Sequence, residues 1–442
     1  MSMHNADTQA VRGRFLDIQH TASQPEDIAS HIRYIEDGLL LSNAGKIVWF
    51  GAWADVDPKL LDGVAVAHYP DQLITPGFID THIHFPQTEM MGAYGEQLLS
   101  WLNNYTFPTE IKFKDKAYAD QIASFFVNEL LKNGTTTALV FCTVHPESVD
   151  ALFEVAASKN MRLIAGKVMM DRHAPETLCD TAQSSYTESK QLIEKWHEKG
   201  RALYAITPRF APTSTDAQLS LAGQLKQEFP SVYVHTHLSE NKDEIAWVKS
   251  LFPHHAGYLD VYHQYGLTGE RSVFAHCVHL NEDEWKCMHD TDSAIAFCPT
   301  SNLFLGSGLF PLRKAWQHGV KVGLGTDVGA GTSFSQLQTL GEAYKVQQLQ
   351  GDTLSAFEAF YHATLGGAKS LDLEDCLGNF NVGKEADFIV IDLNATPLQQ
   401  LRQSHASTIE DHLFALFTLG DDRNIVATYV NGQKVYSSSL TT

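Results

Sequence analysis

Short apolar runs alternate with stretches of helical patterning through the middle of the chain. One helical stretch, at residues 119–134, ends on a glycine, which favours helix termination. Such alternation is typical of a parallel sheet with helices outside it. We count eight apolar runs with strand character, in the stretch 75–87 and at residues 135–141, 162–171, 203–212, 232–240, 272–280, 294–302 and 320–329. Eight β/α units predict an α/β fold, a (β/α)8 TIM-like barrel over residues 74–377.

The two ends of the chain show a different pattern, with short strands and turns. Asn43-Ala-Gly45 and Asn431-Gly432 each separate two apolar runs, and Asn-Gly is a strong hairpin signal. We expect residues 1–73 and 378–442 to pack together as one small β-sandwich domain. No internal repeat, low-complexity tract or long linker interrupts the chain.

Charge and composition restrict the class of partner. Lys and Arg number 32 against 52 Asp and Glu, a formal net charge of −20, which opposes binding to nucleic acid. No apolar run approaches a membrane span of about 18 residues, and the first thirty residues carry no secretory signal. Six cysteines without a C-x-x-C motif fit reduced thiols. We therefore expect a cytoplasmic protein that binds neither nucleic acid nor membrane and acts on a small molecule.

Two histidines lie one residue apart at the end of the first predicted strand. His82 and His84 point to the same face because successive strand residues alternate between faces. Active sites of parallel α/β barrels lie at the C-terminal ends of the strands. A lone His-x-His pair also fits two partly exposed polar residues after a strand, so the other strand ends must decide.

Polar residues also follow three later strands, where barrel geometry would gather them at one mouth. They are His237 and Glu240 in the fifth run, His276 in the sixth and Asp327 in the eighth. Three histidines and a carboxylate can hold Zn²⁺ and leave a position for water. Each of these residues alone is more often a satisfied polar group, but together at strand ends they indicate a metal site.

The sequences PGFIDTHIH, HTHLSEN, FAHC and GTD resemble the metal motifs of the amidohydrolase superfamily, and more narrowly of the guanine deaminases, over essentially the whole chain. The resemblance implies one metal per chain, Zn²⁺ with iron as the alternative, held by His82, His84, His237 and Asp327. Two-metal relatives usually carry a bridging lysine or glutamate on the fourth strand, where this chain has Arg209. Lys167, on the third strand, would revive a two-metal site only if the register were wrong.

The resemblance also implies the reaction, in which hydroxide attacks C2 of guanine and ammonia leaves, giving xanthine. A metal lowers the pKa of water from 15.7 to about 7. Glu240 would carry protons to ring N3 and to the departing amine, a role that favours a pKa raised toward neutrality. His276 would orient the hydroxide and Asp327 would accept its proton, whereas His279 is expected outside the metal site. Without the resemblance, Glu240 would read as a solvated glutamate at a helix start.

Substrate contacts are expected from three places. Arg209 and Phe210 belong to a Pro-Arg-Phe-Ala motif, and arginine only donates hydrogen bonds, which suits the 6-oxo group of guanine and opposes a 6-amino group. Gln87 can both donate and accept, and it shares a wall with His84; His237 lies beside the substrate. Residues 92–110 resemble a lid, with Trp101 available to cover a flat ring. Without the motif, a surface salt bridge for Arg209 and core packing for Trp101 would be favoured.

Two other signals are set aside. His145-Pro-Glu147 matches half of another zinc-deaminase motif, but the chain has no Pro-Cys pair. The glycine-rich stretch 322–331 lacks phosphate-loop spacing. The alternatives that stay open are another amidohydrolase acting on an aminated ring, of the adenosine or triazine type, and, more remotely, a metal-free scaffold. The family resemblance implies a homodimer.

Overall fold

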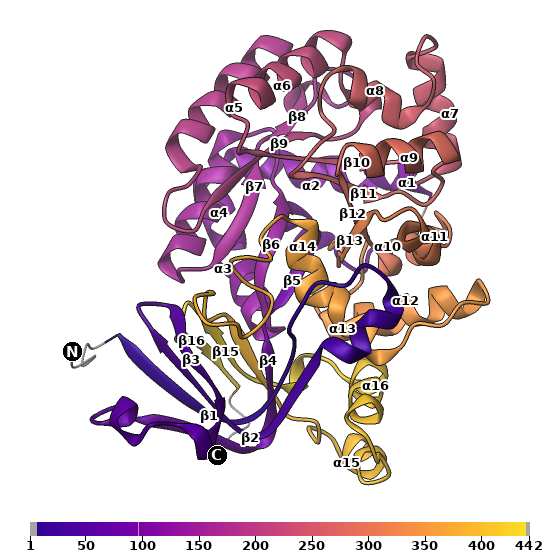
Figure 1. Ribbon diagram of the computed structural model, residues 1–442. Coiled ribbons are helices and arrows are strands. Elements are labelled where there is room, and N and C mark those ends of the chain that lie inside the picture. The colour runs from indigo at the N-terminus through magenta and orange to yellow at the C-terminus, as the bar shows by residue number, and fades with distance from the viewer. Residues whose placement is uncertain (1–6, 96, 439–442) are drawn as a thin grey trace.

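The computed structural model describes residues 7–95 and 97–438, which form a barrel above a smaller sheet (Figure 1). The barrel strands pair in parallel and in sequence order, with a two-residue strand beside the fourth. They are β5 (Phe78–His84), β6 (Thr135–Phe141), β7 (Arg162–Gly166), β8 (Val168–Met169), β9 (Leu203–Pro208), β10 (Tyr233–Leu238), β11 (Ser272–His276), β12 (Ala294–Phe297) and β13 (Lys321–Leu324). The predicted eight-stranded α/β barrel is confirmed.

The barrel closes between its last and first strands through backbone hydrogen bonds. The Asp327 amide donates to the His82 carbonyl and the His84 amide donates to the Val328 carbonyl, both at 2.9 Å. These bonds lie just beyond the end of β13. Closure therefore places the segment after β13 directly beside the two histidines of β5.

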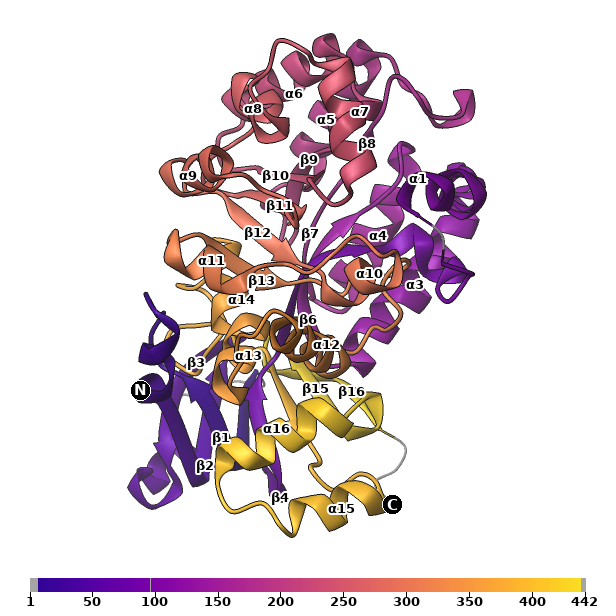
Figure 2. The same cartoon turned by 90° about the vertical axis from the view of Figure 1, so that its right-hand side faces the viewer.

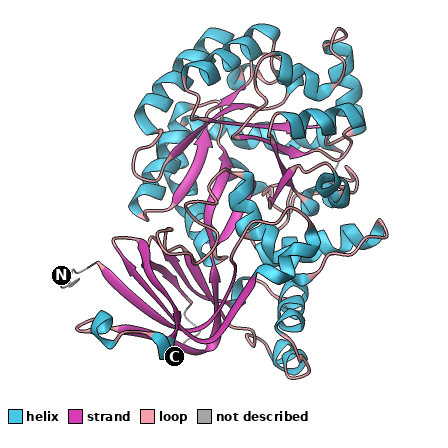
Figure 3. Ribbon diagram, viewed as in Figure 1, coloured by secondary structure: helices cyan, strands magenta, loops and turns pink. Residues whose placement is uncertain are grey.

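Helices surround the strands, as Figure 3 shows by colour. They are α3 (Lys116–Lys132), α4 (Pro146–Ser158), α5 (Ala182–Trp196), α6 (Asp216–Glu228), α7 (Lys242–Leu251), α8 (Tyr258–Gln264), α9 (Glu282–Asp290), α10 (Pro299–Phe304), α11 (Leu312–Gln317), α12 (Gln336–Leu349), α13 (Ala356–Ala363) and α14 (Leu365–Ser370). The predicted helix at 119–134 corresponds to α3, which Asp115 caps by accepting from the amides of Ala117 and Tyr118. None of the described helices has the length and apolar character of a membrane span.

The strands after β5 and β6 are shorter than predicted at their C-terminal ends. Ser239, Cys277 and Asp327 follow β10, β11 and β13, and each has a positive φ, of 50°, 52° and 51°. A left-handed backbone cannot continue a strand. No residue type marks these left-handed positions, so the sequence could not show where the chain turns to present polar groups at the mouth.

Both ends of the chain build the small β domain, as predicted. Its strands are β1 (Thr8–Ile18), β2 (Ile32–Asn43), β3 (Lys46–Ala52), β4 (Val66–Pro76), β14 (Phe388–Ile391), β15 (Ile425–Val430) and β16 (Gln433–Ser437). They are hydrogen-bonded as one seven-stranded sheet in the order β16-β15-β14-β4-β1-β2-β3. Both predicted hairpins are present: Ala44 and Gly45 have φ of 47° and 80°, and Asn431 and Gly432 have 50° and 76°.

Two helices near the C-terminus, α15 (Pro397–Gln403) and α16 (Ile409–Leu419), have no counterpart in the prediction. Figure 2 shows them beside the small sheet and below α12 and α13. α16 packs against both barrel helices, with the rings of Phe414 and Tyr344 4.9 Å apart. The small domain and the barrel therefore share apolar contacts as well as a continuous chain.

Buried ion pairs also join the small domain to the barrel, at the strand ends opposite the histidines. Arg201 donates to Glu385 at 2.5 Å and to Asp387 at 3.2 Å, and Arg162 donates to Glu385 at 2.5 Å. Arg162 begins β7, Arg201 precedes β9, and the two carboxylates precede β14. We call Arg162, Arg201, Glu385 and Asp387 the interdomain cluster.

Candidate active site

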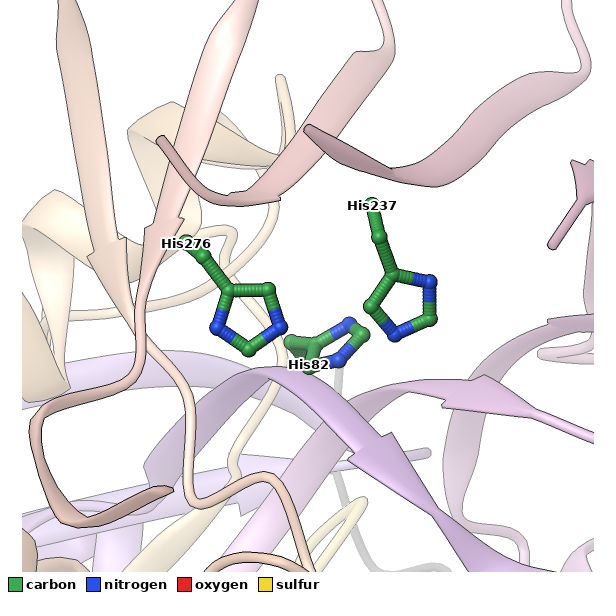
Figure 4. Close-up of side chains that lie close together, drawn as sticks. All are labelled: His82, His237 and His276. Atoms are coloured by element: carbon green, nitrogen blue, oxygen red, sulfur yellow. The ribbon is translucent and has the colours of Figure 1, made fainter. Parts of the chain in front are cut away.

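Imidazole rings from three barrel strands converge at the C-terminal mouth. Figure 4 shows His82 from β5, His237 from β10 and His276 from β11 turned toward one another. His84, two residues along β5, completes the group: its Nε2 lies 3.2 Å from Nε2 of His82 and 3.2 Å from Nε2 of His237. The predicted alternation along β5 thus brings both of its histidines to one point.

Asp327 brings a carboxylate to the same point. Its Oδ1 lies 3.2 Å from Nε2 of His82 and 3.3 Å from Nε2 of His84. Buried Asp80 holds the chain just before it, because Asp80 accepts from the Thr326 amide at 3.1 Å and from the Thr326 hydroxyl. Residues of β5 therefore hold the loop after β13 through hydrogen bonds to its backbone and to the Thr326 side chain.

The ligand atoms of His82, His84 and Asp327 all lie within 4.8 Å of one another and could hold a metal ion, and His237 adjoins them through His84. Ligands about 2.0–2.1 Å from a tetrahedral Zn²⁺ lie about 3.3 Å apart, close to the separations of 3.2–3.3 Å given above. Nδ1 of His237 donates to the Arg209 carbonyl at 2.7 Å, so its Nε2 carries a lone pair facing the other ligands. Burial lowers the pKa of His84 to about 3 and that of His237 well below its usual value, which keeps both rings neutral as ligation requires.

His276 lies on the cavity side of this group. Its Nδ1 is 2.9 Å from the side-chain oxygen of Asn302, and its Nε2 is 3.5 Å from Oε2 of Glu240 and 3.8 Å from Oδ2 of Asp327. Since Asn302 accepts from Nδ1, Nε2 is left free to accept a proton or to bind a metal. His276 is thus placed between the metal-site carboxylate and Glu240.

Glu240 is almost fully buried beside the cavity. Its Oε1 accepts from the Ser307 hydroxyl at 2.9 Å, and its backbone amide donates to Glu244 at 2.9 Å. Burial, reinforced by the charge of Asp327, raises the pKa of Glu240 to about 8. A carboxyl group in this environment can hold a proton at neutral pH and release it to a bound molecule.

A partly open cavity lies beside the cluster. Every predicted substrate contact lines it: His84, Gln87, Trp101, Arg209, Phe210 and His237. Glu240, His276 and Asp327 line it as well. Trp101 belongs to α1 (Leu98–Trp101), which continues through a π-helical turn (Leu102–Thr106) into α2 (Phe107–Glu110). This segment covers the cavity where a lid was expected.

Glu110, at the end of α2, is the main contact that sequence reasoning missed. Both of its oxygens accept from Nη1 of Arg209 at 2.9 Å, and Oε1 also accepts from Nε2 of Gln87 at 3.3 Å. Asn302 and Ser307, which hold His276 and Glu240, were missed too. None of these residues belongs to a spacing motif, so only their positions in space connect them to the site.

Two residues that could have complicated the site lie outside it. The ammonium group of Lys167 pairs with Asp180 and lies 3.3 Å from Glu188, so it does not bridge the histidines. His279 shares a hydrogen bond with the Ser307 carbonyl at 2.8 Å and does not line the cavity. Neither residue therefore belongs to the cluster at the mouth.

Comparison with known proteins agrees with this geometry. Residues 73–435 match the amidohydrolase family. The sequence is 65% identical to guanine deaminase of Escherichia coli K12, in an alignment that covers 97% of this chain and 98% of the relative. It is 40% identical to a probable guanine deaminase of Deinococcus radiodurans, in an alignment that covers 95% of this chain and 97% of that relative.

Solved structures give the same result. E. coli guanine deaminase superposes with a TM-score of 0.95 at 62% identity, covering 98% of this chain and 100% of that one. Guanine deaminase of C. acetobutylicum, solved with guanine in its active site, superposes with a TM-score of 0.87 at 31% identity, covering 97% and 100%. The chain therefore belongs to the amidohydrolase family and, within it, to the guanine deaminases.

Proposed function

We propose that this protein hydrolyses guanine to xanthine and ammonia. The observation that carries the proposal is the cavity itself, whose lining includes Arg209 and Gln87, the expected purine contacts, together with Glu240 and residues of the metal-fitting cluster. The relatives named above support the same substrate. Water supplies the oxygen at C2, and the 2-amino group leaves as ammonia.

Each residue near the reacting centre has a task. When bound, the metal supplies a water molecule of lowered pKa that acts as the nucleophile at neutral pH. Asp327 accepts a proton from that water, and His276 Nε2, 3.8 Å from Asp327 Oδ2, orients it. Glu240 delivers its proton to ring N3, then takes the proton of the new hydroxyl at C2 and passes it to the amine, which leaves as ammonia when the C2–N bond breaks. The proton held by Asp327 then restores Glu240. Ser307 holds Oε1 of Glu240, leaving Oε2 for these transfers.

The expected substrate contacts are of two kinds, polar groups that bind the edge of guanine and side chains that enclose its ring. Arg209 donates to the 6-oxo oxygen, and Gln87 contacts the neighbouring pyrimidine edge. Trp101 and Phe210 enclose the flat ring of guanine, and His84 and His237 line the part of the cavity next to C2. The dense set of polar groups on one edge and aromatic groups on the faces suits a planar, uncharged heterocycle.

We further propose one Zn²⁺ per chain at His82, His84, His237 and Asp327, with iron as the alternative metal. Imidazole and carboxylate ligands suit both metals, so the choice depends on supply as well as on the site. Elemental analysis of protein purified from cells grown with zinc and with iron gives the metal and its stoichiometry.

The assembly and location are also proposed. The family supports a homodimer, which sedimentation equilibrium tests directly.

Six cysteines without a disulfide among the described residues support a reducing, cytoplasmic environment. The proposed domain division is 1–73 with 378–442 against 74–377, and limited proteolysis tests where cleavage separates the two parts.

The decisive experiment measures ammonia release and the loss of guanine absorbance by purified protein, with a metal count on the same sample. Adenine, cytosine and melamine serve as comparison substrates. We expect rapid conversion of guanine alone, with about one metal per chain. Turnover of adenine or melamine in place of guanine would instead support an adenosine-type or triazine deaminase, and a metal-free, inactive protein would support a scaffold.

A further inference from the structure

Glu110 connects the segment that covers the cavity to both purine-reading side chains. Its side chain is fully buried, and it comes from α2, whereas Gln87 follows β5 and Arg209 follows β9. Its carboxylate takes three hydrogen bonds, two from Nη1 of Arg209 and one from Nε2 of Gln87. The three side chains form one buried network at the wall of the cavity.

A carboxylate only accepts hydrogen bonds, and this decides how the Gln87 amide is turned. The amide nitrogen must face Glu110, so the amide oxygen, Oε1, faces away from it. Among the described residues no donor is bonded to Oε1, and Gln87 lines the cavity. Gln87 is therefore left as an acceptor for a bound molecule.

The same network fixes Arg209 as a donor. Glu110 binds Nη1 and also neutralises the guanidinium of Arg209, a residue that is only 2% exposed. The guanidinium carbon lies 5.7 Å from the centre of the Phe107 ring, on the same helix as Glu110. With Nη1 held in this way, Nη2 stays free to donate toward the cavity.

A donor beside an acceptor is complementary to one kind of purine edge. A 6-oxopurine presents an acceptor at O6 and a donor at N1–H, whereas a 6-aminopurine presents a donor at C6 and an acceptor at N1. We infer that Glu110 is a specificity-determining positioning residue, which turns Gln87 to accept from N1–H and holds Arg209 to donate to O6. This inference rests on the proposed deamination of guanine.

A purely structural ion pair between Glu110 and Arg209 would have different consequences. It would affect folding and all substrates alike, whereas a positioning role changes the preference between purine edges. In Glu110→Gln, the oxygen of the new amide accepts the hydrogen bond from Arg209. The nitrogen of that amide then faces Gln87. Gln87 must then present Oε1 to residue 110 and its own nitrogen to the cavity, which opposes N1–H.

The test compares guanine with 2-aminopurine, which keeps the 2-amino leaving group but has a bare N1 and no O6. We expect Glu110→Gln to retain metal and to lower kcat/KM for guanine by about tenfold or more, chiefly through KM. The ratio of kcat/KM for guanine to that for 2-aminopurine should fall by about tenfold or more. Glu110→Asp, which keeps the charge at shorter reach, should give an intermediate ratio.

Glu89→Gln is the matched control, because Glu89 accepts from Lys112 and Tyr118 near the same segment but does not line the cavity. It should keep the wild-type ratio. A fully metallated Glu110→Gln with the wild-type ratio would overturn the inference, as would equal losses on both purines. If Glu110→Gln does not fold, a wild-type ratio in metallated Glu110→Asp would overturn it. Absence of guanine turnover in the unmutated protein would instead reject the proposed function.

Discussion

At the residue scale, the cluster at the mouth separates metal binding from proton transfer. His82, His84 and Asp327 approach one another through the atoms that would hold a metal, whereas Glu240 lies 3.5 Å from His276. Apart from Asp327, to which we assign both tasks, metal binding and proton transfer are therefore carried by different side chains. Single substitutions should separate them.

His82→Ala and Glu240→Gln should fail in different ways. Loss of His82 removes one of four ligands, so bound metal and activity should fall together. Glu240→Gln keeps the ligands and the shape but removes the titrating group, so metal content should stay near that of the unmutated protein while kcat falls by at least about a hundredfold. Elemental analysis and steady-state kinetics on the same samples check this. A metal-free but folded Glu240→Gln protein would contradict the assignment.

Arg209 should affect binding of guanine more than metal content. A charge-assisted hydrogen bond is worth about 1.5–3 kcal/mol, so Arg209→Met should lower kcat/KM by tens to hundreds of fold. It should also leave Glu110 buried without its cation, which will add a loss of stability. Arg423→Met serves as a control, because Arg423 pairs with Asp421 at an exposed position. Equal kinetics for the two variants would exclude Arg209 as a substrate contact.

At the scale of elements, the interdomain cluster links the starts of β7 and β9 to the start of β14. Burial would raise the pKa of Glu385, but hydrogen bonds and charges from Arg162 and Arg201 outweigh it and lower the pKa from 4.5 to about 2. A carboxyl group with a lowered pKa in the folded state stabilises the fold above its unfolded pKa. That stabilisation is lost as the pH falls toward the folded value.

The stability of the fold should therefore decrease on acidification from pH 4.5 to about 2, with about 3 kcal/mol assigned to Glu385. Glu385→Gln should be destabilised at pH 7 and should lack this part of the pH dependence. Urea unfolding at a series of pH values measures both effects. Glu342→Gln, which disrupts an exposed pair with Lys345, should change stability by less than about 1 kcal/mol. The same pH slope in Glu385→Gln and the unmutated protein would refute the assignment.

At the scale of the whole molecule, the metal site joins parts of the chain that are far apart. The residues proposed to hold the metal come from β5, from β10 and from the segment that closes the barrel after β13. A ligand that binds only the folded state stabilises it by an amount that grows with its concentration relative to Kd. Metal binding should therefore support barrel closure as well as chemistry.

Removal of the metal with a chelator should lower the thermal unfolding midpoint by several degrees, and Zn²⁺ should restore it. A stabilisation of about 4 kcal/mol is expected when the metal is present at about a thousand times its Kd. The control is metal-depleted His82→Ala, whose midpoint should not respond to added Zn²⁺. An unchanged midpoint after complete removal from the unmutated protein would contradict the prediction.

The sequence by itself determined the barrel and the small β domain from both chain ends, because the period of apolar positions and the hairpin dipeptides are local signals. It also predicted polar residues gathered at the strand ends, and its resemblance to a known family singled out the cluster of His82, His84, His237 and Asp327. Only the tertiary structure decided which partners surround that cluster. Glu110 meets Arg209, and Ser307 meets Glu240, across distances in sequence that no local pattern encodes. A hydrogen bond between distant segments depends on how the barrel closes, so it becomes visible only once the fold is formed.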